Sequence, residues 1–204
     1  MRNYLLKGEI DRVLAGLKMP YKLVAEMMVW TGRRPTEVLM IQRGDIDHER
    51  KKIAFLQLKK RGKKIDYPMG KGKYDRVYER KKVVMPTDCS AFYDKLIKYL
   101  KSDHWSDYIF PSSRRGDKHI TIRALQKKVK KAGEEVQLSV HPHMFRHSFA
   151  VQYLDKKINV DGIDAIQALF ELKNHLGHSS IDTTMGYLAY VTGNEKLKDL
   201  WNEG

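Results

Sequence analysis

Three short segments of the sequence bring together cationic, imidazole and hydroxyl side chains in a pattern suited to phosphodiester chemistry. The segment TGRRPTEV contains Arg34, HPHMFRHSFA contains His143 and Arg146, and LGHSSIDTTMGYL contains His178 and Tyr187. An arginine guanidinium can bind two phosphate oxygens at once and can stabilise the added negative charge of a pentavalent transition state. We therefore expect Arg34 and Arg146 to hold a phosphate group.

The tyrosine hydroxyl is the natural nucleophile for such a reaction. Its ordinary pKa is about 10, so attack on phosphorus needs a base or nearby cations. His143 can accept the hydroxyl proton, and His178 can donate a hydrogen bond to a phosphate oxygen. Lys59, at the end of a predicted strand, can protonate the departing oxygen as a general acid. The guanidinium groups already supply the charge that Mg²⁺ would bring, so we expect no metal ion and no other cofactor.

Each of these residues also has an ordinary structural interpretation. Arg34 would serve equally well as a surface arginine or as a partner of Glu37, three residues later. His178 would suit the end of a helix, and Tyr187 would suit the hydrophobic core. Lys59 is one lysine among many in its part of the chain.

Histidines and an arginine share one face of the segment HPHMFRHSFA if that segment is a helix. His143, Arg146 and His147 are three and four residues apart, which is the spacing of neighbours along a helical face. Together with His141, the two histidines raise the alternative of a metal site. No HExxH motif and no cysteine cluster accompanies them, which disfavours metal binding.

The spacing between His178 and Tyr187 predicts a break in the helix that carries them. The two residues are nine positions apart, which would place them near opposite faces of one continuous helix. Gly177 is a typical helix terminator. The residues that follow can cap a new helix, and the candidates are Ser179, Ser180, Asp182 and Thr183. We therefore predict a turn that folds Tyr187 back towards His178.

Helical periodicity dominates the elements that must position these side chains. We predict helices over residues 7–17 and 21–32, the second ending at Gly32, and Pro35 suits the first turn of the next helix. Further helices are predicted over residues 90–101, 121–133, 142–154 and 162–177, with a last pair near the C-terminus. The segment KKIAFLQLKK predicts a strand, and ERKKVVMP predicts its partner. The predicted fold class is mainly α with a small antiparallel β-sheet (α+β).

Composition indicates a small protein of the cell interior. The chain has 204 residues, enough for one domain with a proper core, and neither an internal repeat nor a linker marks a second domain. The single cysteine, Cys89, can form no internal disulfide, and no stretch has the character of a signal peptide or a membrane span. We expect a soluble, cytoplasmic protein without a membrane partner.

Positive charge is both high and concentrated. The chain has 39 Lys and Arg against 25 Asp and Glu, a net charge of +14, which makes a polyanion such as nucleic acid the expected partner. The basic segment from Lys59 to Lys82 holds eleven Lys and Arg and three Asp and Glu, a net charge of +8. We expect this basic segment to contact a DNA backbone.

The order of the three segments closely resembles the tyrosine recombinase (phage integrase) catalytic domain, over nearly the whole chain. By position, Arg34 matches the family's first catalytic arginine, His143 and Arg146 its His-x-x-Arg pair, His178 its later histidine and Tyr187 its nucleophile. The resemblance implies attack by Tyr187 on a DNA strand, a 3′-phosphotyrosyl intermediate, release of a 5′-hydroxyl and religation. It also implies double-stranded DNA as the substrate and a homo-oligomer, a tetramer, assembled on that DNA.

The sequence departs from the family pattern in several places. Arg33 stands where the family usually has an apolar residue, which leaves open an exchange of roles between the two adjacent arginines. Lys60 and Lys73 are alternatives to Lys59 as the general acid. Residues 156–178 form a longer approach to the second histidine than is usual, which affects the expected helix geometry there.

The resemblance implies one catalytic domain over residues 1–204, without the family's N-terminal DNA-clamping domain. The chain would then be an excised catalytic domain or a minimal natural enzyme. The last predicted helix has Leu197, Leu200 and Trp201 on one face, which would dock into a neighbouring subunit or onto its own domain.

Two other functional classes remain open. A type IB topoisomerase would share the Arg, His and Tyr chemistry but relax supercoils as a monomer. The integrase-like spelling LGHSS and the tail around Trp201 argue against it. A DNA-binding protein that does not cleave is the other class, and the complete set of chemical residues argues against it.

Overall fold

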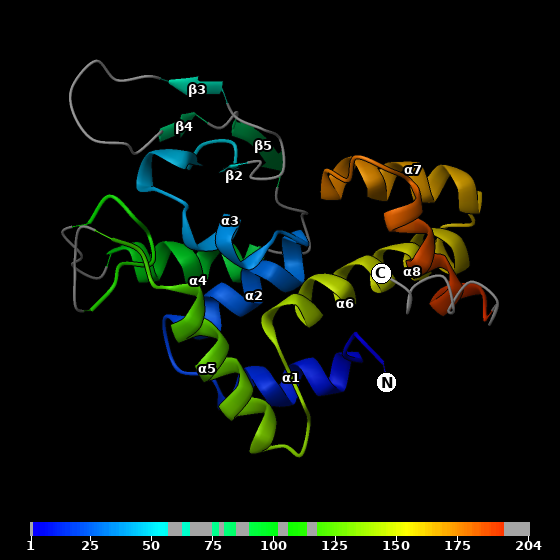
Figure 1. Cartoon of the computed structure of the whole chain (residues 1–204), viewed down its shortest axis with the longest axis horizontal. Helices are drawn as coiled ribbons and strands as arrows, with labels where there is room; N and C mark the ends of the chain where they lie inside the picture. The colour runs from blue at the N-terminus through cyan, green and yellow to red at the C-terminus, as the bar shows by residue number, and fades with distance from the viewer. Residues whose placement is uncertain are drawn as a thin grey trace. The chain divides into compact units, whose positions relative to one another are not determined.

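The computed structural model describes residues 2–56, 63–65, 75–77, 80–84, 90–101, 106–113 and 118–193. The chain separates into two compact units, one formed by residues 1–34 and 125–204 and the other by residues 35–124. Figure 1 labels the helices and strands of both units.

The first compact unit is helical and carries most of the predicted site residues. Its helices are α1 (Lys7–Gly16), α2 (Tyr21–Thr31), α5 (Ile122–Glu134), α6 (Pro142–Asp155), α7 (Ala165–Leu176) and α8 (Asp182–Thr192). The first three residues of α5 belong to the second unit, and α6 continues into a π-helical turn at Lys156–Val160. Pro142 stands in the first turn of α6, where its missing N–H costs nothing. The Asp164 side chain caps α7 by accepting from the amides of Ile166 and Gln167.

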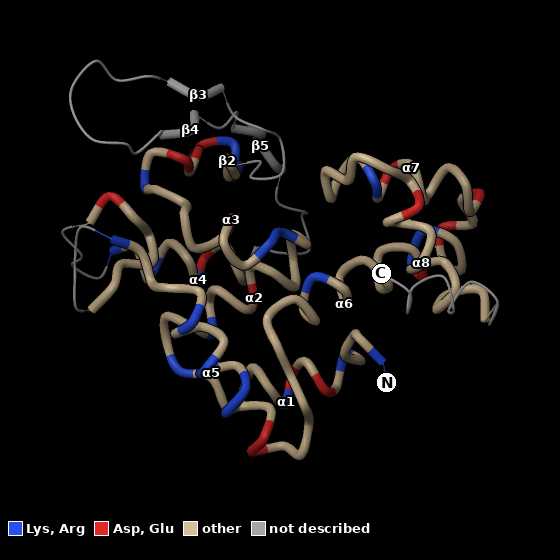
Figure 2. The backbone as a smooth tube through the Cα atoms, in the orientation of Figure 1, with Lys and Arg blue, Asp and Glu red and all other residues tan. Residues whose placement is uncertain are grey.

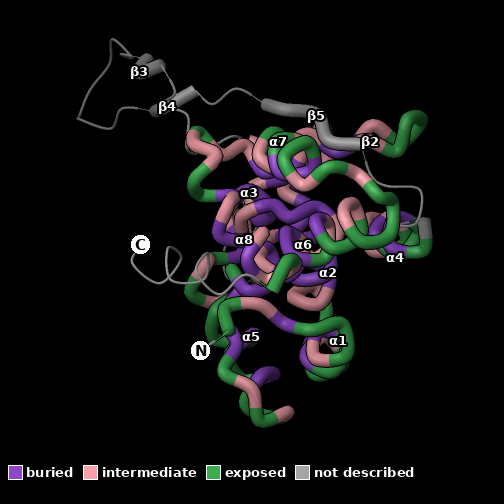
Figure 3. Tube along the Cα trace, turned by 90° about the vertical axis from the view of Figure 1, so that its right-hand side faces the viewer, coloured by how far each residue is buried: buried purple, intermediate pink, exposed green. Residues whose placement is uncertain are grey.

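Helix α6 is the centre of the first unit. It packs against α2, α7 and α8, and its residues Phe145, Ala150 and Leu154 are fully buried. Figure 3 shows the buried stretches gathered on α2, α6 and α8. Because several helices surround it, α6 can carry a polar side chain into the interior only where that side chain finds a partner.

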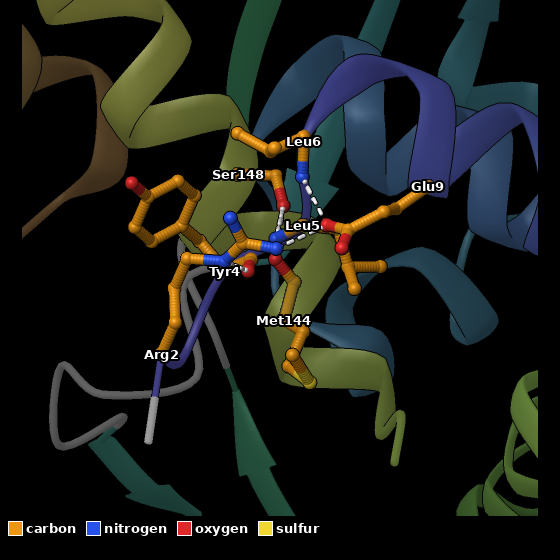
Figure 4. A network of polar contacts seen from close by, with 7 residues as sticks. All are labelled: Arg2, Tyr4, Leu5, Leu6, Glu9, Met144 and Ser148. Carbon is orange, nitrogen blue, oxygen red and sulfur yellow. Dashed lines mark hydrogen bonds and ion pairs between the residues drawn. The ribbon is translucent and has the colours of Figure 1, made fainter. Parts of the chain in front are cut away.

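The N-terminal segment is fastened to α6 by hydrogen bonds, which Figure 4 draws from close by. The buried amide of Leu5 donates to Ser148 Oγ at 2.8 Å, and the same hydroxyl donates to the Met144 carbonyl at 2.8 Å. Glu9 accepts from the amide of Leu6 at 2.7 Å and so caps the start of α1. These contacts fix where the chain begins relative to α6.

The second compact unit combines one long helix with short strands. Its elements are α3 (Pro35–Leu39), a 3₁₀ turn at Arg43–Asp45, β1 (Ile46–Asp47), β2 (Lys52–Leu56), β3 (Lys63–Ile65), β4 (Asp75–Val77), β5 (Arg80–Val84) and α4 (Ser90–Lys101). Strands β1, β2 and β5 form one antiparallel sheet in that order, and β3 pairs with β4. Along β2, Ile53 and Phe55 are buried while their neighbours are partly exposed, as expected for a strand with one face on the core.

The predicted fold class is confirmed, and the structure adds strands that were not predicted, among them β1 beside β2. Each helix predicted between residues 7 and 177 is present, with ends shifted by at most a few residues. Strands β2 and β5 pair antiparallel as predicted, with Phe55 opposite Lys81. The structure adds a separate β3–β4 pair inside the basic segment. Its strands have three residues each, which is too short for an alternating pattern to be seen in the sequence.

Basic residues recur along α5, as Figure 2 shows. Lys127, Lys128, Lys130 and Lys131 are all exposed. Glu134 lies 3.7 Å from the Lys130 ammonium group and Glu135 lies 3.9 Å from that of Lys131. In the part of the chain that the structure describes, no helix is both long enough and apolar enough to cross a bilayer.

Candidate active site

The loop after α2 is set by a glycine in the left-handed conformation. Gly32 has φ 62° and its amide donates to the Met28 carbonyl, so the helix stops where the sequence predicts. A Cβ at Gly32 would lie 2.3 Å from a ring carbon of Phe149 on α6. Close packing and backbone conformation therefore both require glycine here.

The two arginines that follow Gly32 have different surroundings. Arg33 is 1% exposed and donates to the His175 carbonyl on α7 at 2.9 Å. Arg34 is partly exposed, and its positive charge contributes to lowering the pKa of His143 and opposes the rise in the pKa of Tyr187. Arg33 therefore serves the scaffold, while Arg34 acts electrostatically on the two residues expected to move a proton.

Arg146 is buried between the ends of two helices. It is 3% exposed, and it donates to the Gly32 carbonyl at 2.6 Å and to the Leu176 carbonyl at 3.2 Å. Carbonyls at helix C-termini lack intrahelical partners and carry partial negative charge, so a cation is stabilised there. These contacts let the interior hold a guanidinium that would otherwise be costly to bury.

His178 links Arg146 to the start of α8. Its Nε2 lies 2.9 Å from an Arg146 nitrogen, and its Nδ1 lies 2.9 Å from Thr184 Oγ1. A guanidinium can only donate, so Nε2 accepts and the ring carries its hydrogen on Nδ1, which donates to the threonine hydroxyl. The Arg146 contact thus fixes the tautomer of His178, and the two contacts together fix the orientation of its ring.

The predicted break between α7 and α8 is present. Helix α7 ends at Leu176, Gly177 adopts φ 69°, and α8 begins at Asp182. The residue before α8 is Ile181, so none of the four candidate capping residues occupies the cap position. Ser180 instead accepts from the Asp182 amide at 3.1 Å. The turn folds α8 back along α6, which brings Tyr187 to the same helix that carries Arg146.

Tyr187 lies inside the first unit with its hydroxyl bonded to His147. It is 2% exposed, and its ring packs within a cluster that includes Ala150, Leu172 and Leu176. The hydroxyl oxygen is 2.8 Å from His147 Nδ1. Burial raises the pKa of Tyr187 to about 12, against the opposing charges of Arg146 and Arg34. The side chain is therefore a core aromatic whose hydroxyl bonds to His147 and feels the charges of Arg146 and Arg34.

The two histidines one turn apart on α6 differ in exposure. His143 is exposed as a residue, but its ring is partly desolvated, and this desolvation, followed by the charges of His141, Arg146 and Arg34, lowers its pKa below the ordinary value of 6.5. His147 is partly buried, and burial followed by the charges of His143, Arg146 and His141 lowers its pKa to about 4. Both rings are therefore neutral near pH 7 and can accept a proton.

His147 is a site residue that sequence reasoning placed on the right helical face but gave no chemical role. Its i+4 spacing from His143 was the available signal. The spacing alone could not show that α8 packs against α6 and places the Tyr187 hydroxyl beside His147.

Several predicted residues lie outside the described part of the chain. These are Lys59 and its alternatives Lys60 and Lys73, and the tail residues Leu197, Leu200 and Trp201. Most of the basic segment from Lys59 to Lys82 lies outside it as well, apart from the backbone of three short strands. Within the described residues, no group of three or more His, Cys, Asp or Glu side chains is arranged to hold a metal ion.

Comparison with curated proteins and family models identifies close resemblance over both compact units. The model of the phage integrase family matches residues 4–192. Tyrosine recombinase XerA of Thermococcus onnurineus is 32% identical over 189 residues, which are 90% of this chain and 56% of that protein. A tyrosine recombinase of Pseudothermotoga lettingae is 29% identical over 96% of this chain and 58% of its own length. The chain thus spans about half the length of the curated relatives it matches.

Solved structures share the fold at low sequence identity. The crystal structure of XerA recombinase matches with a TM-score of 0.64 at 22% identity, over 100% of this chain and 65% of that one. The catalytic domain of bacteriophage HP1 integrase matches with a TM-score of 0.56 at 20% identity, over 95% of this chain and 90% of that one. XerH recombinase bound to its difH substrate matches with a TM-score of 0.59 at 22% identity, over 91% and 50%. On the extent of the family match and the shared fold, the chain belongs to the phage integrase family of tyrosine recombinases.

Proposed function

We propose that this protein is a site-specific recombinase that cleaves and rejoins double-stranded DNA through a covalent bond to Tyr187. The observation that carries the proposal is the convergence of Arg34, Arg146 and His178 with the Tyr187 hydroxyl in one compact unit. A core tyrosine has no need of two arginines whose charges act on its hydroxyl. A phosphodiester-cleaving nucleophile does need them.

The proposed first step is in-line attack on phosphorus. Arg34 and Arg146 bind the non-bridging oxygens. His178 donates a hydrogen bond to one of them once its Nε2, which accepts from Arg146 in the structure, has taken up a proton. Tyr187 oxygen forms a bond to phosphorus, and the bond to the 5′-oxygen breaks. A 3′-phosphotyrosyl intermediate results, and a partner 5′-hydroxyl later reverses the step to rejoin a strand.

Proton movements are the costly part of this step. A pKa of about 12 for Tyr187 leaves roughly one molecule in 10⁵ ionised at pH 7, which corresponds to about 7 kcal/mol. We propose that the hydroxyl loses its proton to His143 as the bond to phosphorus forms, because full ionisation beforehand is so unfavourable. Lys59 is proposed to protonate the leaving 5′-oxygen.

The reaction is proposed to need no metal ion, since guanidinium groups occupy the role of a divalent cation. Cleavage should therefore proceed unchanged in a chelating buffer. A requirement for added Mg²⁺ would contradict this part of the mechanism.

We further propose that both compact units form one catalytic domain that works as a homo-oligomer, a tetramer, on DNA. The family match across residues 4–192 supports a single domain, and a transposon integrase of the same fold, solved in complex with circular intermediate DNA, supports DNA as the partner. The basic segment from Lys59 to Lys82 is proposed to add backbone contacts. Replacing four of its lysines with Gln should flatten the salt dependence of DNA affinity, and an unchanged salt slope would remove this assignment.

The experiment that tests the function is a search for a covalent protein–DNA adduct on denaturing gels. A pool of nicked duplexes with randomised flanking sequence supplies targets and traps the intermediate, because the short fragment beyond the nick diffuses away. We expect an adduct with the wild-type protein and none with Tyr187→Phe, which keeps the ring in the core. An adduct that survives in Tyr187→Phe would show that another residue attacks. Relaxation of supercoiled plasmid by dilute monomer, without joining of two sites, would favour a topoisomerase.

A further inference from the structure

His147 and Tyr187 form a direct polar contact at the tyrosine hydroxyl. The His147 Nδ1 to Tyr187 oxygen distance is 2.8 Å, and the two ring centroids are 5.7 Å apart at an interplanar angle of 43°. His147 follows directly after Arg146, which holds His178. Neighbouring residues of α6 therefore hold both ends of the segment that runs from His178 to the nucleophile.

Protonation decides what this contact can do. Near pH 7 the His147 ring is uncharged, because its pKa is about 4, and the phenol is protonated, because its pKa is about 12. The contact is therefore a hydrogen bond between two neutral groups, in which the phenol can donate to Nδ1. A neutral partner of this kind orients the hydroxyl.

Orientation matters because the tyrosine ring alone does not fix its hydroxyl. The ring packs in a mainly apolar cluster, and apolar contacts restrict the position of the ring without orienting the hydroxyl. A buried hydroxyl without a partner is destabilising, so the site that offers one selects where the oxygen sits. Here that partner is His147, and the charge of Arg146 acts on both His147 and Tyr187.

We propose that His147 is the positioning residue of the nucleophile, holding the Tyr187 hydroxyl beside Arg146 so that it meets an arriving DNA phosphate in line. The inference rests on the proposed function of Tyr187. It separates two jobs on one helix: His143, exposed on the first turn of α6, takes the proton, and His147, one turn later, fixes the direction of attack.

The test compares His147→Leu with His147→Asn in single-turnover cleavage of the nicked duplex. Leu keeps an apolar side chain of similar bulk but offers no polar atom. The Asn amide can reach the position of Nδ1 and restore a hydrogen bond to the phenol. His141→Leu is the matched control, since it makes the same change at an exposed position just before α6.

We expect His147→Leu to cleave about 10- to 100-fold more slowly, which is the usual effect of a nucleophile displaced by about 1 Å. We expect His147→Asn to recover to within about threefold of wild type, with the DNA dissociation constant unchanged in both variants and in His141→Leu. Thermal unfolding of each variant separates loss of positioning from loss of fold.

A second substrate tests whether the defect of His147→Leu lies in the attack by Tyr187 or in the departure of the 5′-oxygen. Sulfur in place of the 5′-bridging oxygen makes a leaving group that needs no proton, so it relieves a defect in the general acid. The slow rate of His147→Leu should persist with this substrate. Rescue by the sulfur substrate, or a wild-type rate in His147→Leu, would overturn the positioning role, as would His147→Asn remaining as slow as the Leu variant while fully folded.

One further comparison measures stability and needs no DNA. In a double-mutant cycle on unfolding, His147→Leu and Tyr187→Phe should be non-additive, because each removes one half of the same contact. Additive effects would overturn the contact on which the inference stands. Absence of any adduct from the wild-type protein would instead contradict the proposed function, so the two failures are distinguishable.

Discussion

The C-terminal ends of α2 and α7 are built alike but used differently. Each helix stops at a glycine with φ between 60° and 70°, and each offers a terminal carbonyl to the guanidinium of Arg146. After Gly177 the next residue, His178, contacts Arg146 directly. After Gly32 the next residue is buried in the scaffold, and the second one, Arg34, acts on Tyr187.

The difference shows how the same cap can produce either a functional residue or a structural one. Arg33 donates back to the His175 carbonyl on α7, and the His175 ring in turn hydrogen-bonds the Thr31 carbonyl on α2 at 2.9 Å. These two bonds tie the two helix ends together. The two helix ends then hold Arg146 in place. Side chains near these ends that take no part in these bonds are available for chemistry.

Replacing each of the two arginines by alanine is the strongest test of this difference between the two helix ends. Arg34→Ala should lower adduct formation by about 10³-fold, since it removes a phosphate-binding cation, and should change the free energy of unfolding by about 0.5 kcal/mol or less. Arg33→Ala should lower the free energy of unfolding by about 2–3 kcal/mol, because it strips a buried hydrogen bond from a helix end. Single-turnover cleavage and denaturant unfolding measure the two effects. A stable Arg33→Ala protein that cannot cleave would reverse the assignment.

Substituting the two glycines tests whether the two ends are equally constrained. At Gly32 a Cβ would lie 2.3 Å from Phe149 and 2.9 Å from Leu176, so Gly32→Ala should cost about 3–4 kcal/mol from clash and left-handed backbone together. Gly177→Ala should cost about 1 kcal/mol, the ordinary penalty for the left-handed conformation. Denaturant midpoints at constant m-value provide the measurement. Equal losses would mean that the close packing at Gly32 does not set its cost.

Acid titration tests the burial of His147 on α6, the helix whose Arg146 contacts the ends of α2 and α7. The folded pKa of His147 is about 4, below the unfolded value of about 6.5. Between these values the unfolded state binds more protons, so stability is full above pH 6.5 and falls as the pH drops towards 4, by about 2–3 kcal/mol. His147→Asn should remove this part of the pH dependence. Unfolding curves of the two proteins at matched pH values give the difference, and parallel curves would contradict a buried neutral His147.

The smallest effect is expected from a contact of α6 that lies away from the C-terminal ends of α2 and α7. Ser148→Ala removes the hydroxyl that accepts from the Leu5 amide, and we expect a loss of about 1 kcal/mol in unfolding free energy. Adduct formation by the folded variant should stay within about twofold of wild type, since the hydrogen bonds of the Ser148 hydroxyl go to Leu5 and Met144. A large loss of cleavage would extend the site towards the N-terminal segment drawn in Figure 4.

Local patterns in the sequence predicted the elements well. Gly32 and Gly177 end helices because glycine alone adopts the left-handed cap cheaply, and that preference is visible in any sequence. Helical periodicity located α6, and with it the shared face of His143, Arg146 and His147.

Contacts made across the unit were beyond those local patterns. The burial of Arg33 depends on where α7 ends, and the pairing of His147 with Tyr187 depends on how α8 returns along α6. Both are set by tertiary packing between segments more than 30 residues apart in the chain, for which composition and spacing hold no signal. The cap of α8 shows the same limit at short range, because Ile181 takes the position that Ser and Asp residues were expected to fill.

Mapping the DNA-linked residue by mass spectrometry tests the central claim most directly. Trypsin cleavage after Lys173 and Lys196 would release one peptide that holds both Tyr187 and Tyr190, and fragmentation of the nucleotide-modified peptide distinguishes them. Tyr190 is an internal control, because it sits one turn later on α8 and packs edge-on against Tyr4 at 4.9 Å. We predict that the nucleotide is on Tyr187. A nucleotide on Tyr190, or on any other residue, would contradict the assignment of the nucleophile and the mechanism built on it.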